Sequence, residues 1–212
     1  MPLAKAKTCV PLRIHSAEEY FQLYPDKMYL PYNAIEQATH ELLRGYEKEK
    51  RIFVFGNGGS AALASHFACD LGKGTIPHGT RTKRFRVLAL TDNLPLITAW
   101  ANDKSYDCVF AEQLRNFVAP GDITFAISGS GNSVNILRAL ELARDAGAFN
   151  IGLTGFRGGQ MKRLCDVCII IPSDNMQIVE DLHLSVAHAI FSVICQRLFT
   201  DSLATIASQA AD

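Results

Sequence analysis

Two stretches of the chain decide the fold: RIFVFGNGGS over Arg51–Ser60 and DITFAISGSGNS over Asp122–Ser133. Each begins with a short apolar run typical of a buried strand and passes directly into a turn rich in glycine and serine. A segment with helical periodicity follows each turn, over about Ala61–Leu71 in the first case and Val134–Ala146 in the second. The two stretches therefore predict two strand–turn–helix units of the same kind.

Three further apolar runs are expected to be strands, over Arg86–Leu90, Asn150–Leu153 and Val167–Ile171. Short apolar strands that alternate with helices are typical of a parallel sheet covered on both faces. Five strands in this order predict a doubly wound α/β sandwich. Other helical segments are expected at Ala17–Leu23, Ala34–Lys48, Ser105–Phe117 and Gln160–Leu164. One more is expected after the strand Arg86–Leu90 and through Trp100.

The last expected helix, Met176–Phe199, is apolar on nearly every side. A helix with no polar face must be buried. Because a 212-residue domain cannot easily enclose such a helix, we expect part of it to lie in a subunit interface. No linker or repeat divides the chain, so we expect one domain over residues 1–212, with a helical extension over about 1–50 and a core over about 51–200.

The charge balance excludes some classes of partner. The chain has 21 Lys and Arg against 21 Asp and Glu, so its net charge is zero. Nucleic-acid binding relies on clustered cations, and the short run of Arg81, Lys83, Arg84 and Arg86 is expected to be a solvated loop. No run of about 18 apolar residues indicates a membrane helix, and the N-terminus lacks the apolar core of a secretory signal. We expect a cytoplasmic protein that binds neither nucleic acid nor membrane.

The six cysteines lack the density of a disulfide scaffold. Cys165 and Cys168 form a CxxC pair at the start of an expected strand, whereas redox-active CxxC pairs open a helix. We therefore expect buried, reduced thiols, which fits the cytoplasm.

The two Gly/Ser turns carry the chemical signal. In open α/β sheets, ligands bind outside the carboxyl ends of the strands, where helix N-termini favour anions. The hydroxyls of Ser128, Ser130 and Ser133 add uncharged donors, so the second turn is suited to a phosphate monoester. The alternative is an ordinary helix cap at Asn132 or Ser133. Two such turns on one sheet favour the phosphate site.

A dinucleotide site is a second alternative, because Gly56, Gly58 and Ala61 fit the pattern G-x-G-x-x-G/A. That pattern expects an acidic residue about 20 positions further on. The nearest candidate, Asp92, lies about 30 positions past Ala61. The dinucleotide site also leaves the serine-rich second turn unexplained.

Four segments, FGNGGSAALASHFACDL, ISGSGNSVNILRALELA, IGLTGFRGG and VEDLHLSVAHAI, together resemble the sugar isomerase (SIS) domain. The resemblance covers roughly residues 34–199 and is strongest to the phosphoheptose isomerase branch. It implies a flavodoxin-like, three-layer αβα sandwich with a five-stranded parallel sheet, whose N- and C-terminal helices pack in the oligomer. It also implies a homotetramer with active sites between subunits, and aldose–ketose isomerisation of sedoheptulose 7-phosphate through an enediol.

The resemblance also assigns roles to residues. The family's catalytic carboxylate and histidine fall on Asp70 and His188, and the zinc ligands of some members fall on His66, Asp70, Glu180 and His188. The positions expected to bind phosphate or sugar are Asn57, Gly58, Gly59, Ser60, Asp103, Ser128, Gly129, Ser130 and Ser133.

Three positions depart from the family pattern: Asp70 replaces the usual Glu, Glu180 the usual Gln, and Gly129 a Thr. A reacting group displaced by about 1 Å can cost about a hundredfold in rate. A second carboxylate would strengthen metal binding, or raise its neighbour's pKa without metal. The departures leave two alternatives open: isomerisation of a different sugar phosphate, or a non-catalytic tetramer that binds sugar phosphate or associates with a bacterial replication initiator.

The residues themselves allow further expectations about the zinc site. His66 and Asp70 are four positions apart and share one helix face, as zinc ligands or as an ordinary His–Asp pair. Glu180 and His188 are about 12 Å apart along a helix, so both reach one ion only if Glu180 bends inward from a frayed start. A hydrogen-bonded core histidine is the alternative for His188. We expect His183 to support the site or an interface, and Lys73 to be solvated.

Overall fold

The computed structural model describes residues 15–16, 18–19, 29–76 and 83–209, with side chains as far as residue 200. The helix expected at Ala17–Leu23 falls largely outside the described residues, as does Arg81 of the basic run.

The five strands form one parallel sheet in the order β2-β1-β3-β4-β5. This is the flavodoxin-like order of a doubly wound sheet, in which the topological switch lies between β1 and β3. The expected five-stranded parallel sheet is confirmed. The strands are β1 (Arg51–Gly56), β2 (Arg86–Ala89), β3 (Ile123–Ser128), β4 (Phe149–Thr154) and β5 (Val167–Ile170).

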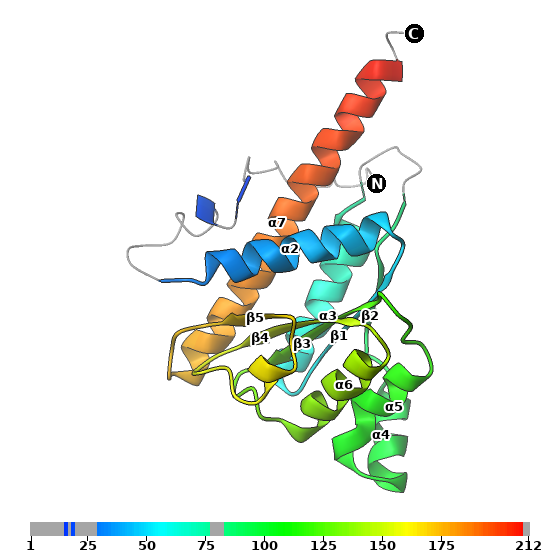
Figure 1. The fold of residues 1–212 in the computed structure, drawn as a ribbon, viewed down its shortest axis with the longest axis vertical. Coiled ribbons are helices and arrows are strands. Elements are labelled where there is room, and N and C mark those ends of the chain that lie inside the picture. Colours follow the sequence, from blue (N-terminus) through cyan, green and yellow to red (C-terminus); the bar gives the residue numbers. More distant parts are fainter. Residues whose placement is uncertain (1–14, 17, 20–28, 77–82, 210–212) are drawn as a thin grey trace, which may run out of the picture.

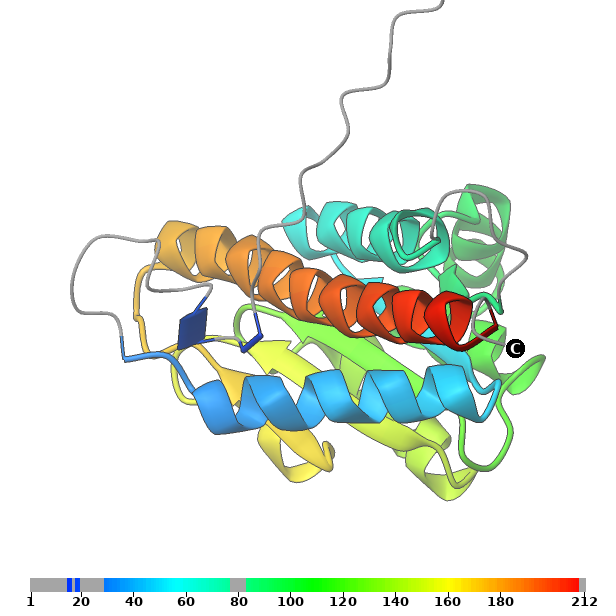
Figure 2. The same cartoon turned by 90° about the horizontal axis from the view of Figure 1, so that it is seen from above.

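Helices cover both faces of the sheet, which confirms the three-layer sandwich (Figure 1, Figure 2). One layer holds α2 (Tyr32–Glu47), α3 (Gly59–Cys69) and α7 (Met176–Gln209), and the other holds α4 (Leu94–Asp103), α5 (Val109–Arg115) and α6 (Val134–Asp145). Alternate residues of β1 pack against the two helix layers, because successive side chains point to opposite faces of the sheet. Ile52 and Val54 pack in the first core, and Phe53 and Phe55 in the second.

Helix α7 extends ten residues past the predicted end at Phe199, and its C-terminal turns project beyond the sheet (Figure 1). Val186 and Ile190 are buried, whereas Ile178 and Leu184 are 46% and 39% exposed. Among the described residues, Met176–Thr200 meets the length and mean hydropathy of a membrane span, and 61% of the tested window is buried in the fold. Core packing therefore accounts for much of its apolar character.

Three short helices depart from regular α-helix. The predicted helix over Ala61–Leu71 is α-helical to Cys69 and continues as a π-helical turn over Asp70–Gly74. The segment expected at Ser105–Phe117 begins with a 3₁₀ turn, η2 (Tyr106–Cys108). A second 3₁₀ turn, η3 (Met161–Arg163), precedes β5. The π turn matters most, because such turns occur frequently at functional sites and this one begins at Asp70.

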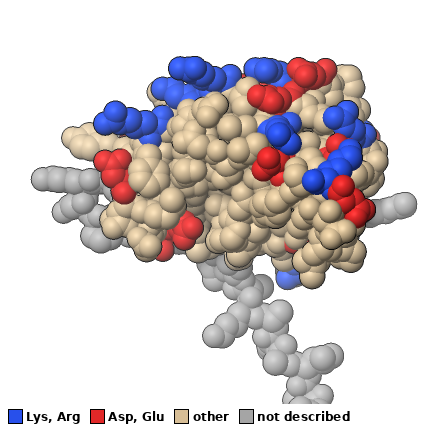
Figure 3. All heavy atoms as spheres, turned by 90° about the horizontal axis from the view of Figure 1, so that it is seen from below, with Lys and Arg blue, Asp and Glu red and all other residues tan. Residues whose placement is uncertain are grey.

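The face formed by α4–α6 carries both signs of charge side by side (Figure 3). Glu112 lies 3.2 Å from the Lys104 ammonium and 3.4 Å from Arg115, and Arg138 lies 3.7 Å from Asp107. This face is therefore not a cationic surface of the kind that binds nucleic acid.

Candidate active site

The two Gly/Ser turns lie at the topological switch of the sheet. Strands β1 and β3 are neighbours, and Gly56 is in register with Ile127, so both strands end at the same edge. The first turn leads into α3 on one face, and the second leads into α6 on the other. The crevice between such turns is where open α/β sheets bind ligands.

The second turn, Ser128–Ser133, points two hydroxyls toward each other. The Oγ of Ser128 accepts a hydrogen bond from the Gly131 N–H at 3.2 Å and lies 3.4 Å from the Oγ of Ser133. Ser133 is the N-cap of α6, yet its side chain makes no capping bond. The alternative of an ordinary capped helix is therefore not what the structure contains. Both hydroxyls are placed beside a helix N-terminus, where an anion is favoured.

The loop after β4 packs against this turn and forms hydrogen bonds with it. Gly131 has φ +65°, and a Cβ there would overlap the carbonyl oxygen of Gly158, so only glycine fits. The Gly131 carbonyl accepts from the Met161 N–H at 3.0 Å, and Asn132 Oδ1 accepts from the Gln160 N–H at 3.0 Å. Hydrogen bonds from this loop thus fix the turn before any ligand binds.

The first turn is tied to the second through a pair of amides. The side chains of Asn57 and Asn135 exchange two hydrogen bonds of 2.9 Å, and the Tyr106 hydroxyl donates to Asn57 Oδ1 at 3.0 Å. The expected ligand Asn57 therefore uses its side chain within the protein. No local sequence pattern indicates Asn135 or Tyr106, because both reach Asn57 only through packing; Asn135 is 2% exposed in the folded chain.

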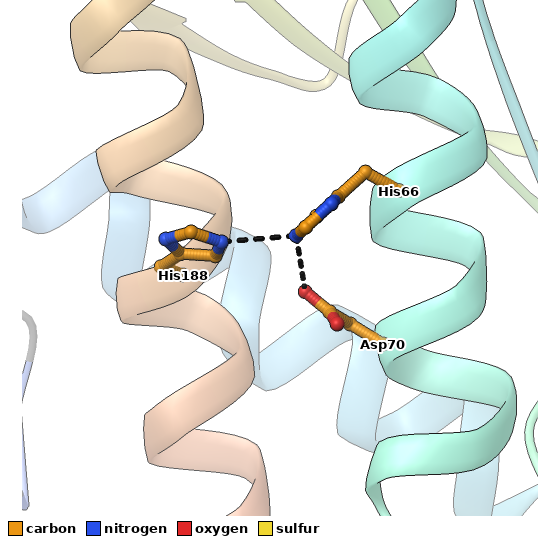
Figure 4. A group of neighbouring side chains, drawn as sticks. All are labelled: His66, Asp70 and His188. Carbon is orange, nitrogen blue, oxygen red and sulfur yellow. Dashed lines mark hydrogen bonds and ion pairs between the residues drawn. The ribbon is translucent and has the colours of Figure 1, made fainter.

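A His–Asp–His cluster joins α3 to α7 (Figure 4). His66 Nε2 lies 3.0 Å from His188 Nε2 and 3.3 Å from Asp70 Oδ2. His66 is at the C-terminal end of α3, and Asp70 opens the π turn that follows. The structure thus brings together three of the four expected zinc ligands.

The cluster holds a carboxylate oxygen without a hydrogen-bond donor. Asp70 Oδ2 is buried and makes no hydrogen bond, despite its short distance to the His66 ring. His66 Nε2 faces both neighbours, and one proton on it can serve only one of them. Burial raises the pKa of Asp70, and the two histidines oppose that rise. Burial lowers the pKa of His188, which Asp70 opposes.

The three side chains fit a metal ion. Their ligand atoms all lie within 4.8 Å of one another. Zinc bonds of about 2.0–2.1 Å give ligand–ligand distances of about 3.3 Å in a tetrahedron, close to the 3.0 Å and 3.3 Å found here. A cation would also neutralise the unpartnered oxygen of Asp70, whose burial otherwise costs free energy.

Glu180 stands outside this cluster. It is exposed, and its Oε1 lies 3.0 Å from the position of a Cβ on Gly59, at the start of α3. A carboxylate is stabilised there by the helix dipole. Glu180 also lines a cavity of about 300 Å³ between α3 and α7, together with Ser60 and His66. It therefore shares this cavity with one residue of the cluster, His66, without belonging to the cluster.

Asp103, Lys73 and Gly129 lie outside the His–Asp–His cluster. Asp103 ends α4, which covers the opposite face of the sheet from α3 and α7, so its own chain does not bring it to the cluster. It is exposed and accepts a hydrogen bond from its neighbour Asn102. Lys73 is exposed on the π turn. At Gly129, a Cβ would lie 2.5 Å from the sulfur of Met176. Met176 therefore fills the space that the family's threonine would need.

His183 connects α7 to the end of β4. It is 1% exposed, and the interaction of its ring with the Thr154 backbone carbonyl leaves Nε2 without a partner. Burial lowers the pKa of His183 to about 4, and the bond to Thr154 opposes this. The Thr154 hydroxyl in turn donates to the Gly129 carbonyl at 3.3 Å. This neutral histidine thus links the helix that carries His188 to the second turn, Ser128–Ser133, which is the expected phosphate turn.

Comparison with known proteins gives one consistent result. A family model described as "SIS domain" matches residues 31–155. A phosphoheptose isomerase of Aliarcobacter butzleri is 38% identical over 164 residues, which cover 77% of this chain and 85% of that protein. The structure of a phosphoheptose isomerase from Francisella tularensis is 32% identical with a TM-score of 0.73, covering 79% of this chain and 87% of that one. One from Neisseria gonorrhoeae is 29% identical with a TM-score of 0.72, covering 84% and 90%.

Proposed function

The chain belongs to the SIS domain family, and we propose that it is an aldose–ketose isomerase that converts sedoheptulose 7-phosphate to a heptose 7-phosphate. The observation that carries the proposal is the course of α3, which begins in the first Gly/Ser turn and ends at the His–Asp–His cluster. His66 lies seven residues after Gly59, about 10 Å along the helix axis. The second Gly/Ser turn, where the phosphate is placed, follows the strand next to the one that leads into the first turn. A long sugar can therefore have its phosphate near the start of α3 and its reacting carbons near the end.

Two proton transfers make up the proposed reaction. Asp70 takes a proton from C1 of the ketose, giving an enediol, and returns a proton to C2. A carboxyl whose pKa is raised by burial is a stronger base near neutral pH than an ordinary one. His188 moves the hydroxyl proton from O1 to O2. The lowered pKa of His188 keeps its imidazole neutral, so it can accept one proton and release another.

The phosphate is held with uncharged donors in this proposal. The hydroxyls of Ser128 and Ser133 and the N-terminal amides of α6 supply hydrogen bonds, and the helix dipole supplies favourable potential. No cluster of Lys or Arg is needed, which agrees with a net charge of zero.

We propose zinc as the metal of the cluster, held by His66, Asp70 and His188, with Glu180 as the fourth ligand. For the first three residues, the support is the mixed nitrogen and oxygen donor set and its spacing. For Glu180, the support is that it lines the same cavity as His66. Zinc, when bound, supplies a Lewis acid that polarises the substrate oxygens. The neutral form of His188, favoured by its lowered pKa, is the form that can act as a ligand.

We also propose a cytoplasmic homotetramer with shared active sites. The exposed apolar residues Ile178 and Leu184 on α7 support an interface along that helix. The position of Asp103, away from its own cluster, supports a role in a neighbouring subunit's site. Sedimentation of the purified protein tests the assembly, and a monomer at micromolar concentration would contradict it.

The test of the activity is incubation of the protein with sedoheptulose 7-phosphate in D₂O, followed by proton NMR. We expect an aldose signal and deuterium at C2, because the proton that Asp70 takes from C1 exchanges with solvent while the enediol exists. Parallel reactions contain zinc, a chelator, or a six-carbon or five-carbon ketose phosphate. Absence of aldose from every substrate, with and without zinc, would contradict the isomerase; turnover of a shorter ketose alone would contradict only the heptose assignment.

A further inference from the structure

The sulfurs of Cys165 and Cys168 both lie beside Gly152, near the edge of the sheet. Cys168 on β5 is in register with Gly152 on β4. Because Gly152 has no side chain, the side chains of Cys165 and Met161 fill the space beside Cys168. From the position of a Cβ on Gly152, the sulfur of Cys165 is 2.7 Å away and that of Cys168 is 3.4 Å away. The glycine therefore lets the two thiols approach each other.

The two thiols differ in acidity. The pKa of Cys168 is lowered, first by the thiol of Cys165 and further by the charge of Lys162. The pKa of Cys165 is raised by its interaction with Cys168 and by burial. The expectation of buried thiols is wrong, because both cysteines are partly exposed, so small reagents can reach them. One thiol is thus suited to attack as a thiolate, and the other to follow as the second nucleophile.

We propose that Cys165 and Cys168 form an oxidisable dithiol that closes to an intramolecular disulfide on reaction with a small-molecule disulfide. The Cys168 thiolate attacks one sulfur of the reagent, which forms a mixed disulfide and releases one reagent thiolate. Cys165 then gives its proton to water and attacks the Cys168 sulfur, which releases the second reagent thiolate. In total, two protein thiols are oxidised, and one small disulfide is reduced to two thiols.

The 3₁₀ turn η3 connects the dithiol to the phosphate turn. The Cys165 N–H donates to the Met161 carbonyl at 3.2 Å, and the Met161 N–H donates to the Gly131 carbonyl at 3.0 Å. A disulfide fixes Cys165 against β5 and therefore changes the position of the end of the 3₁₀ turn η3, which includes Met161. On the proposed function, we therefore expect oxidation to raise KM for the sugar phosphate about threefold to tenfold, the effect of one neutral hydrogen bond, with a smaller change in kcat.

The test is incubation of the full chain with glutathione disulfide, followed by acid quenching, alkylation and peptide mass spectrometry. We expect the peptide holding Cys165 and Cys168 to lose two hydrogen atoms and to resist alkylation at both residues. Cys165→Ser should stop the reaction at a glutathione adduct on Cys168. Cys168→Ser should leave Cys165 largely unmodified. Cys69→Ser, which removes an exposed cysteine with no thiol partner in the described part of the chain, is the matched control and should still form the disulfide.

Thermal unfolding of each variant establishes that it is folded, and Cys165→Ala is a second variant should the serine destabilise the protein. Free thiols at both positions, under conditions that modify Cys69, would overturn the dithiol. A disulfide that leaves KM unchanged would overturn only the link to the phosphate turn. Because the mass readout needs no turnover, its result is independent of the isomerase assignment.

Discussion

The phosphate turn and the His–Asp–His cluster lie at the two ends of one functional region, but they are built differently. In the turn, backbone and side-chain groups pair with one another, as in the bond from the Gly131 N–H to Ser128 Oγ at 3.2 Å. In the cluster, Asp70 Oδ2 is buried without a hydrogen bond. The turn is complete before a ligand binds, whereas the cluster needs a cation or a substrate proton to satisfy it.

This difference follows from the sequence separation of the residues that form each part, the phosphate turn and the His–Asp–His cluster. The phosphate turn is a local structure between β3 and α6, braced by the loop after β4. The cluster requires α7 to pack beside α3, so that His188 meets a residue 122 positions earlier in the chain. We therefore expect changes in the cluster to act on the chemical step and changes in the turn to act on binding.

The largest expected effect is that of Asp70→Asn. The amide keeps the size of the side chain but cannot accept a proton, so we expect kcat to fall about 10³-fold, within the range for loss of general base catalysis. Binding of the sugar phosphate, measured by calorimetry on the metal-free protein, should change by less than about threefold, because the phosphate contacts lie elsewhere.

Asp145→Asn is the matched control, since Asp145 is exposed at the end of α6 on the opposite layer. It should leave both quantities unchanged. Equal losses of kcat and of binding in Asp70→Asn would mean that Asp70 belongs to the binding site rather than to the chemistry.

The same difference explains what could be predicted from the sequence. The strands and the phosphate turn follow from local patterns, such as the apolar run of β3 and the SGSGNS turn. His66 and Asp70 also follow from their spacing on one helix. The π turn at Asp70 leaves no comparable pattern, and the pair of Asn57 with Asn135 depends on residues 78 positions apart. The place of Glu180 depends on packing between α3 and α7, so helix spacing alone did not fix it.

An intermediate effect is expected at His183, which links the two parts. A buried neutral histidine with a pKa of about 4, against 6.5 when unfolded, binds fewer protons in the folded state. Its contribution to stability is therefore present above pH 6.5 and is lost as the pH falls toward 4. The full shift corresponds to about 3 kcal/mol.

His183→Asn keeps a donor for the Thr154 carbonyl but does not titrate. Urea unfolding of both proteins at several pH values measures the difference between them, which cancels the opposite trend that Asp70 contributes through its raised pKa. We expect the free energy of unfolding of the wild type, relative to the variant, to decline by about 3 kcal/mol between pH 6.5 and 4. Parallel curves would mean that His183 is solvated and makes no fixed link.

The smallest expected effect is that of Ser133→Ala in the phosphate turn. Its hydroxyl contacts Ser128 Oγ at 3.4 Å and does not cap α6, so its removal should leave the helix intact. Loss of one hydrogen bond to a charged phosphate corresponds to about a tenfold rise in KM, with kcat changed by less than about threefold because the cluster is untouched. Competition by inorganic phosphate should weaken by the same factor, since it depends on the same hydroxyl. A fall in kcat without a change in KM would contradict the division of labour between the two parts, because it would place Ser133 in the chemical step instead of in binding.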